Sequence, residues 1–351
     1  MVSGRIPPLS FSVLVAEDER NIVESLSFLM TRAGLAVSVA YDGPSTLRLL
    51  EQKVPDLILL DVMMPGMDGL DVCRRIKADP RTASIPVIFV TALGQTQDEA
   101  LGFSVGAVDY ITKPISPPTL LRRVQTHLSL VHTEQLDALA REALEMLGEA
   151  GHYNDTDTGA HIWRMAAYSR SVAGTLGWSD ADAALLEMAA PMHDTGKIGI
   201  PDSILKAPRA LTPDEWDIMK THATIGSDIL GKSPNPVFQM AATIARHHHE
   251  RWDGTGYPDA LAGEAIPMAA QIVAIADVFD ALTMKRPYKE AWPLEEAFLH
   301  IRDGAGTHFD PTLVEAFFSI EDRLRALKSE WDKRETQAAR SGRAIQTLKW
   351  M

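Results

Sequence analysis

The segment "PDLILLDVMMPGMDG", residues 55–69, decides the fold of the first part of this 351-residue chain. Its apolar run ends at Asp61 and is followed by a turn that contains proline and two glycines. A short, continuous apolar run of this kind is typical of a strand buried on both faces of a parallel sheet. Ligands bind at the carboxyl ends of such strands, which makes Asp61 a candidate functional residue.

Three neighbouring apolar runs share this form. Their sequences are "FSVLVAEDE", "IPVIFVTA" and "AVDYITKP", and they end at Glu17 and Asp18, at Thr91, and near Lys113. Helical patterns separate the runs. Strands that alternate with helices predict an α/β domain with a parallel sheet and crossover helices. We therefore expect the polar residues at the strand ends to converge on Asp61.

The expected cluster combines three carboxylates with one lysine. Glu17, Asp18 and Asp61 would repel one another unless a hard divalent cation such as Mg²⁺ joined them. Asp61 could then attack a phosphoryl donor. Lys113 would neutralise the phosphoryl oxygens, and the hydroxyl of Thr91 would hydrogen-bond one of them. The alternative is a structural ion pair between Asp61 and Lys113.

Residues 11–129 resemble the receiver domain of two-component response regulators. An acid pair, "LLDVMMPGMDG", "VTA" and "DYITKP" occur in the order and spacing typical of that family. The resemblance implies a doubly wound, five-stranded parallel sheet and phosphorylation of Asp61 by a cognate sensor histidine kinase. It also implies a Mg²⁺ site formed by Glu17, Asp18, Asp61 and the carbonyl of Met63. The implied switch residues are Thr91, Tyr110 and Lys113.

Composition excludes several classes of protein. A formal net charge of -13 and a pI of about 5.3 argue against nonspecific binding to duplex DNA, which needs a basic surface. The single cysteine, Cys73, cannot form an internal disulfide and suits a reducing compartment. No apolar stretch approaches the roughly 20 residues of a spanning helix, and no signal peptide is recognisable. We expect a cytoplasmic protein that binds neither DNA nor membrane.

A long helical pattern follows Pro117 and Pro118 and extends from Thr119 to about Gly148. It predicts that the last helix of the receiver continues as a connector helix, residues 130–150. Apolar residues recur along it at mixed spacings of three and four, so a coiled-coil-like contact in a homodimer is one interpretation. A helix packed on its own domain is the other. Residues 321–351 have a charged helical pattern that predicts an exposed, frayed terminal helix.

Most of the 11 histidines lie in the second half of the chain, where the patterns are helical throughout. The pair His193–Asp194 ends an apolar pattern that predicts a helix from Ala181 to His193. Polar groups at such a position need partners. Imidazole and carboxylate ligands suit Fe, Mn, Ni, Co or Zn better than Ca²⁺. Two such metals about 3.5–4 Å apart can activate water against phosphorus.

Residues 151–320 resemble the HD-GYP family, phosphodiesterases of the HD metal-dependent phosphohydrolase superfamily. The resemblance rests on "MHDTGK" and on "HHHERWDGTGYP", residues 247–258. It also includes "IPDSIL", "LTPDEW", "RPYKEAW" and "GTHFDP". It implies an all-α domain that opens cyclic di-GMP, either stopping at linear pGpG or continuing to GMP.

The resemblance also implies a centre of two or three divalent metals, with Fe or Mn expected. The implied ligands are Asp157, His161, His193, Asp194, His222, His248, His249 and Asp277. Some members carry Glu in place of Asp157, and the shorter Asp side chain leaves the third metal open. Catalytic roles fall to Lys197, His193 and Asp194, and the implied substrate-binding residues are Lys197, Tyr257, Arg286 and Lys289. The motif assigns no role to His247.

These patterns favour an enzyme controlled by phosphorylation of Asp61. One alternative is a binding module, which either holds cyclic di-GMP with low turnover or docks other signalling proteins through the GYP region. Another is a hydrolase of a different cyclic dinucleotide, such as 3',3'-cyclic GMP-AMP. The motifs specify phosphodiester chemistry more closely than they specify the base.

Overall fold

The computed structural model describes residues 11–92, 102–152, 159–284 and 291–341. Contacts divide the chain into two compact units, Met1–Ala138 and Leu139–Met351. Three of the predicted site residues, Asp157, Arg286 and Lys289, lie outside the described residues. No helix within the described ranges is long and apolar enough to cross a membrane.

The first unit contains a five-stranded parallel sheet with the strand order β2-β1-β3-β4-β5. The strands are β1 (Ser12–Ala16), β2 (Ala36–Ala40), β3 (Leu57–Asp61), β4 (Val87–Thr91) and β5 (Asp109–Thr112). The chain order reverses between β1 and β3. The carboxyl ends of these two strands therefore border the crevice in which doubly wound sheets bind their ligands. This topology confirms the predicted fold class of the receiver.

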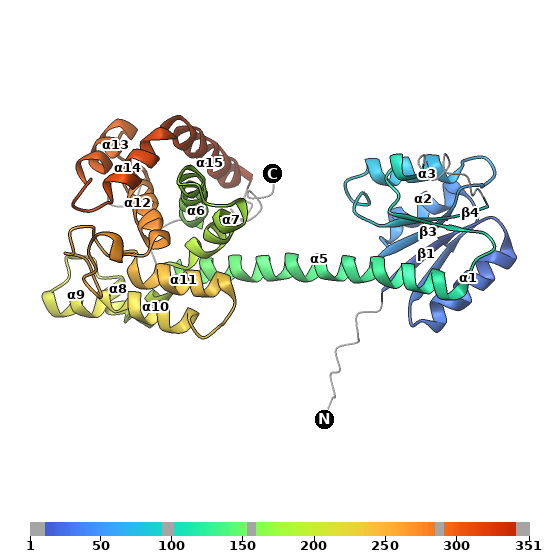
Figure 1. Ribbon diagram of the computed structural model, residues 1–351, viewed down its shortest axis with the longest axis horizontal. Coiled ribbons are helices and arrows are strands. Elements are labelled where there is room, and N and C mark those ends of the chain that lie inside the picture. The colour runs from blue at the N-terminus through green and yellow to red at the C-terminus, as the bar shows by residue number, and fades with distance from the viewer. Residues whose placement is uncertain (1–10, 93–101, 153–158, 285–290, 342–351) are drawn as a thin grey trace, which may run out of the picture. The chain divides into compact units, whose positions relative to one another are not determined.

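Four described helices cover the two faces of this sheet (Figure 1). They are α1 (Arg20–Arg32), α2 (Gly43–Gln52), α3 (Gly69–Ala78) and α5 (Pro117–His152). Helices α2 and α3 form one core with the face that contains Leu14 and Leu60. Helices α1 and α5 form another with the face that contains Val13 and Val15. Because successive strand residues point to opposite faces, an apolar run is what a strand covered on both sides requires.

Helix α5 is continuous over 36 residues. Its two leading prolines are compatible with a helix start, because the first N–H groups have no partner within the helix. Leu120, Val124 and Leu128 are buried in the first unit. Leu136 and Leu139 lie further along the helix and are exposed. The dimer contact through this helix stays a prediction.

The second unit is helical. Its helices are α6 (Gly159–Thr175), α7 (Asp180–Ala189), α8 (Asp202–Leu205), α9 (Pro213–Lys220), α10 (His222–Leu230), α11 (Pro236–His247), α12 (Met268–Thr283), α13 (Leu294–Asp303), α14 (Pro311–Ser319) and α15 (Glu321–Ser341). Helix α12 is central, and every residue from 269 to 276 is buried. It contacts α6, α11 and α13.

The helix expected to run from Ala181 to His193 ends earlier, at Ala189. Pro191 lacks an N–H group and cannot continue an α-helical ladder. The chain continues instead as the short 3-10 helix η1 (Ala190–Met192), with His193 as its C-terminal cap. His193 and Asp194 connect η1 to the next segment, η2 (Thr195–Gly199).

The prediction of an exposed, frayed terminal helix is wrong for the described part of residues 321–351. Leu324, Leu327 and Trp331 of α15 are buried. Trp331 packs with Ile162 and Trp163 of α6. These three α15 residues recur at spacings of three and four, which places them on one helical face. The many charges of this segment occupy the other faces and obscure the stripe.

Candidate functional site

The predicted acid cluster of the first unit is assembled at the ends of β1 and β3. Glu17, Asp18 and Asp61 each offer an oxygen, and these oxygens lie within 4.8 Å of one another. The Nζ atom of Lys113 lies 2.8 Å from Glu17 Oε2 and 3.0 Å from Asp61 Oδ2. Burial raises the pKa of Glu17 to about 7, although the hydrogen bond from Lys113 opposes this shift. Carboxylates held this close suit a hard cation such as Mg²⁺.

Of the remaining receiver residues, Met63 contacts this cluster, and Thr91 and Tyr110 lie on β4 and β5. The backbone N–H of Met63 donates a hydrogen bond of 3.2 Å to Asp61 Oδ1. Thr91 is buried at the end of β4. Tyr110 on β5 is half-buried, and its ring centroid lies 5.8 Å from the guanidinium carbon of Arg123 on α5. The switching role of Thr91 and Tyr110 stays a prediction.

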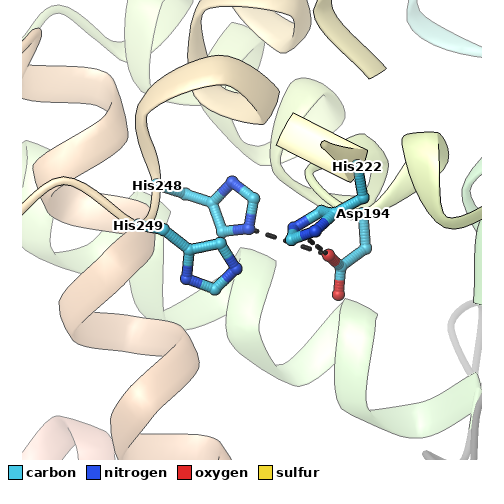
Figure 2. Close-up of side chains that lie close together, drawn as sticks. All are labelled: Asp194, His222, His248 and His249. Carbon is cyan, nitrogen blue, oxygen red and sulfur yellow. Dashed lines mark ion pairs between the residues drawn. The ribbon is translucent and has the colours of Figure 1, made fainter. Parts of the chain in front are cut away.

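A second cluster lies in the helical unit and joins Asp194, His222, His248 and His249 (Figure 2). Their ligand atoms lie within 4.8 Å of one another. Asp194 precedes η2, His222 begins α10, and the two consecutive histidines follow the end of α11. Figure 2 shows the rings of His222 and His248 turned toward the carboxylate of Asp194. Their Nε2 atoms are 3.4 and 3.7 Å from Asp194 Oδ1.

Backbone carbonyls fix the tautomers of these histidines. The Nδ1 atom of His222 lies 2.7 Å from the carbonyl oxygen of Met219, and that of His248 lies 3.0 Å from Ala245 O. A nitrogen beside a carbonyl must carry the proton, so Nε2 keeps its lone pair. Both Nε2 atoms are buried and make no hydrogen bond to any described residue. Burial also lowers the pKa of His222 to about 4, so the ring is neutral at neutral pH. Such nitrogens fit a metal ion.

A third cluster, His161, His193 and Asp277, adjoins the second. His161 Nε2 lies 3.3 Å from Asp277 Oδ1, and His193 Nε2 lies 3.2 Å from Asp194 Oδ2. Asp194 therefore contacts a histidine of each group. Burial disfavours a charged His161, but hydrogen bonds with Asp277 and Asp280 outweigh burial and raise its pKa to about 10. Seven of the eight predicted metal ligands thus lie together, and Asp157 is outside the described residues.

Two glycines permit this assembly. A Cβ at Gly196 would overlap the carbonyl of His222, so only glycine lets η2 approach α10 this closely. A Cβ at Gly256 would likewise overlap the carbonyl of His249. The glycine of "HDTGK" therefore lets η2 approach α10, while the glycine of "GTGYP" lets the turn fold back on the segment that follows α11.

Lys197 and two aromatic rings border the clusters. Lys197 Nζ lies 2.8 Å from Asp194 Oδ2. The ring of Tyr257 stacks on that of His249, with centroids 4.7 Å apart and an interplanar angle of 27°. Trp216 on α9 is 47% exposed, and its ring lies 6.3 Å from that of Tyr257. The sequence did not single out Trp216, because neither its exposure nor its neighbours are visible in a local pattern.

His247 contacts Asp259 and is not part of the ligand cluster that contains His248 and His249. Its Nε2 atom lies 3.2 Å from Asp259 Oδ2, and Arg246 donates two hydrogen bonds to the same carboxylate. Glu250 accepts hydrogen bonds of 2.8 and 3.0 Å from the backbone N–H groups of Asp259 and Leu261. These contacts anchor the segment after the GYP turn to the end of α11.

Sequence reasoning also missed Asp280 and Arg164, which are both buried beside His161. The sequence does contain a signal for Asp280. Asp280 lies in "MAAQIVAIADVFDALT", an otherwise apolar pattern of a buried helix, and a buried carboxylate requires a partner. The pattern could not identify that partner.

The HD domain family matches residues 128–313, and the response regulator receiver domain family matches residues 13–125. The cyclic di-GMP phosphodiesterase response regulator RpfG of Xanthomonas campestris pv. campestris is 40% identical, with 95% of this chain and 93% of that protein covered. A cyclic di-GMP phosphodiesterase of Thermotoga maritima is 37% identical, with 96% and 97% covered. The 3'3'-cGAMP-specific phosphodiesterase 2 of Vibrio cholerae is 41% identical over 54% of this chain and 36% of that protein. This chain therefore belongs to the family of response regulators in which a receiver domain precedes an HD domain.

Proposed function

We propose that this chain is a response regulator whose HD domain hydrolyses a phosphodiester bond of cyclic di-GMP. The observation that carries the proposal is the pair of ligand groups that adjoin through the contact between Asp194 and His193, with Lys197 beside Asp194. Two relatives that align over almost the whole chain are named as cyclic di-GMP phosphodiesterases, which supports this substrate.

Two divalent metals fit the two groups. One set of ligands is Asp194, His222, His248 and His249, and the other is His161, His193 and Asp277. Imidazole and carboxylate donors favour Fe or Mn, and Ni, Co and Zn are compatible with them. When bound, such a pair supplies an activated water and neutralises charge on the phosphoryl oxygens. A third metal would need Asp157, which lies outside the described residues.

The chain's own residues would bind and orient the substrate. Lys197 is only 18% exposed and lies against Asp194, so its ammonium would contact the scissile phosphate and stabilise charge that develops there. Tyr257 and Trp216 offer aromatic faces at the edge of the site, where a guanine could stack. Arg286 and Lys289 would hold the second phosphate, as the family resemblance implies.

Control of the enzyme would begin at Asp61. Its carboxylate would accept a phosphoryl group from a sensor histidine kinase, with Mg²⁺ held by Glu17, Asp18 and Asp61. Lys113 already contacts two of these carboxylates and would neutralise the incoming oxygens. The added charge would then bias the arrangement of the receiver.

Product analysis tests the hydrolase. The purified full chain is loaded anaerobically with Mn²⁺ or Fe²⁺, its bound metals are counted, and products of cyclic di-GMP are resolved by chromatography. Linear pGpG or GMP is expected, and it should be absent when His193 and Asp194 are both replaced by Ala. Intact substrate in a chain that holds at least two metals would contradict the proposal and favour a receptor that binds without turnover.

The base specificity is tested separately. A relative from Vibrio cholerae that aligns with about half of this chain is named as specific for 3'3'-cGAMP. Competition between cyclic di-GMP and 3',3'-cyclic GMP-AMP in one reaction compares the two substrates directly. We expect cyclic di-GMP to be consumed faster. The reverse order would keep the hydrolase and replace its substrate.

A further inference from the structure

We infer that Asp280 is a positioning residue of the metal centre, and that Arg164 and the terminal helix α15 hold its carboxylate in place. The inference rests on the proposed metal centre but concerns residues to which no motif assigns a role. Asp280 is fully buried on α12, one turn after Asp277. Its Oδ2 atom lies 2.6 Å from Nδ1 of His161.

His161 is held differently from three of the other ligand histidines. The Nδ1 atoms of His193, His222 and His248 each lie beside a backbone carbonyl. The Nδ1 atom of His161 instead lies beside the Asp280 carboxylate, while its Nε2 faces Asp277. A carboxylate behind a ligand histidine fixes the ring, selects the tautomer and makes the inner nitrogen a better donor to metal.

Arg164 fixes the carboxylate in turn. It lies one turn after His161 on α6 and is 1% exposed. Its Nε atom donates to Asp280 Oδ1, and its Nη2 atom donates to Asp280 Oδ2 at 2.8 Å. This two-pronged contact restrains both oxygens of the carboxylate. It also balances a charge that would otherwise be buried alone.

Helix α15 completes the chain of contacts. Glu335 Oε2 lies 3.5 Å from Nη1 of Arg164, and Asp332 Oδ1 lies 3.9 Å from the same atom. The buried Trp331 holds this part of α15 against α6. The HD family match ends at residue 313, before α15 begins. A helix beyond the matched region therefore supports a ligand of the metal centre through Arg164, Asp280 and His161.

The first test removes the buried charge pair as a unit. The full-length double variant Asp280→Asn with Arg164→Gln leaves no unpaired charge in the core. We expect its metal affinity, measured by competition with a chelator, to fall about 10–100-fold, the usual effect of losing such a partner. Thermal unfolding of the metal-free chain shows whether it is folded. The visible spectrum of the Co²⁺-loaded chain should also change, because the geometry around His161 changes.

A second variant keeps the core intact. Glu335→Gln alters a half-exposed residue of α15, and Glu330→Gln on the same helix, where Glu330 pairs with Arg334, is the matched control. We expect Glu335→Gln to lower the metal affinity roughly twofold to fivefold, a small effect because solvent screens such pairs. Glu330→Gln should leave the metal affinity unchanged.

The outcomes distinguish the role of Asp280, the role of α15 and the proposed metal centre. A folded double variant with wild-type metal affinity and an unchanged Co²⁺ spectrum would overturn the role of Asp280. Equal affinities for the two α15 variants would overturn the role of α15 alone. A wild-type chain that binds no metal would instead overturn the proposed metal centre on which the inference rests.

Discussion

The three consecutive histidines show how the orientation of a side chain decides its role. His247, His248 and His249 are consecutive, yet His247 binds Asp259 while the other two face the metal-ligand group. Residues one apart at a helix end point about 100° apart, so one run of identical residues serves two purposes. Burial lowers the pKa of His222 to about 4, which keeps its ring neutral and leaves Nε2 able to bind a metal ion.

The receiver site should depend on pH through Glu17. Burial raises its pKa from an ordinary 4.5 to about 7, so below that pH a proton occupies the carboxylate and must leave before Mg²⁺ binds. We expect Mg²⁺ affinity to increase as the pH rises from about 6 to about 8. Isothermal titration calorimetry measures this Mg²⁺ affinity in the full chain, after the HD site has been filled with its own metal. The Glu17→Gln control should bind weakly at both pH values. Equal wild-type affinity at the two pH values would contradict the prediction.

Trp216 should contribute to substrate affinity. Stacking of a base on an aromatic ring stabilises binding by about 1–3 kcal/mol. We therefore expect Trp216→Ala to raise the KM for cyclic di-GMP about tenfold, with the metal content unchanged. Trp216→Phe should recover most of the loss, and Ile218→Ala tests another exposed apolar residue of α9 as a control. An unchanged KM for Trp216→Ala would exclude stacking on this ring.

Among the elements, the approach of η2 to α10 is decisive for the site. It carries Asp194 to His222, and it depends on glycines at both surfaces, Gly196 and Gly226. The break at Pro191 sends the chain along η1 into this contact. Neither segment forms the ligand set alone. The site therefore depends on packing between two short elements.

A methyl group at this contact should disrupt the site. Gly196→Ala would place its Cβ against the backbone of α10, and overpacking of this kind typically costs about 1–3 kcal/mol. We expect a lower melting temperature of the metal-free chain and fewer bound metals. Gly174→Ala on α6 is the matched control, since its Cβ would meet no atom within 4 Å beyond its chain neighbours and the nearby backbone of its own helix, and a small stabilisation is expected. Normal metal binding by Gly196→Ala would show that the contact is not required.

On the scale of the whole molecule, two units with separate hydrophobic cores carry two separate candidate sites. The acid cluster uses residues of the first unit, and both histidine clusters use residues of the second. Among the described residues, the ligands of each cluster therefore all belong to one unit. Helix α5 is the element that contributes residues to both units.

Replacing the phosphoacceptor should affect regulation alone. Asp61→Asn removes the attacking carboxylate, so we expect no phosphorylation by a small phosphoryl donor. Metal content of the HD domain and basal hydrolysis should stay unchanged, because the metal-ligand residues belong to the other unit. Metal analysis and product chromatography, before and after treatment with the donor, measure both effects. Loss of HD-domain metal in this variant would contradict the independence of the two sites.

Local patterns in the sequence predicted the fold class of both units. Apolar runs ending at Asp61 and Thr91 predicted a parallel sheet, because burial on both faces leaves a continuous apolar signature. The family resemblance carried by the motifs around His193 and His248 implied ligand residues, and the structure brings seven of them together. The prediction of the sheet succeeded because strand period and turn residues are local properties.

Tertiary structure alone decided the partners of these residues. The sequence does not show that Asp280 lies behind His161, that Arg164 holds Asp280, or that Trp331 of a highly charged helix is buried. These contacts join residues that are far apart along the chain. Their geometry depends on how whole helices pack, and helix packing depends on the combined shape and burial of many side chains rather than on any local pattern.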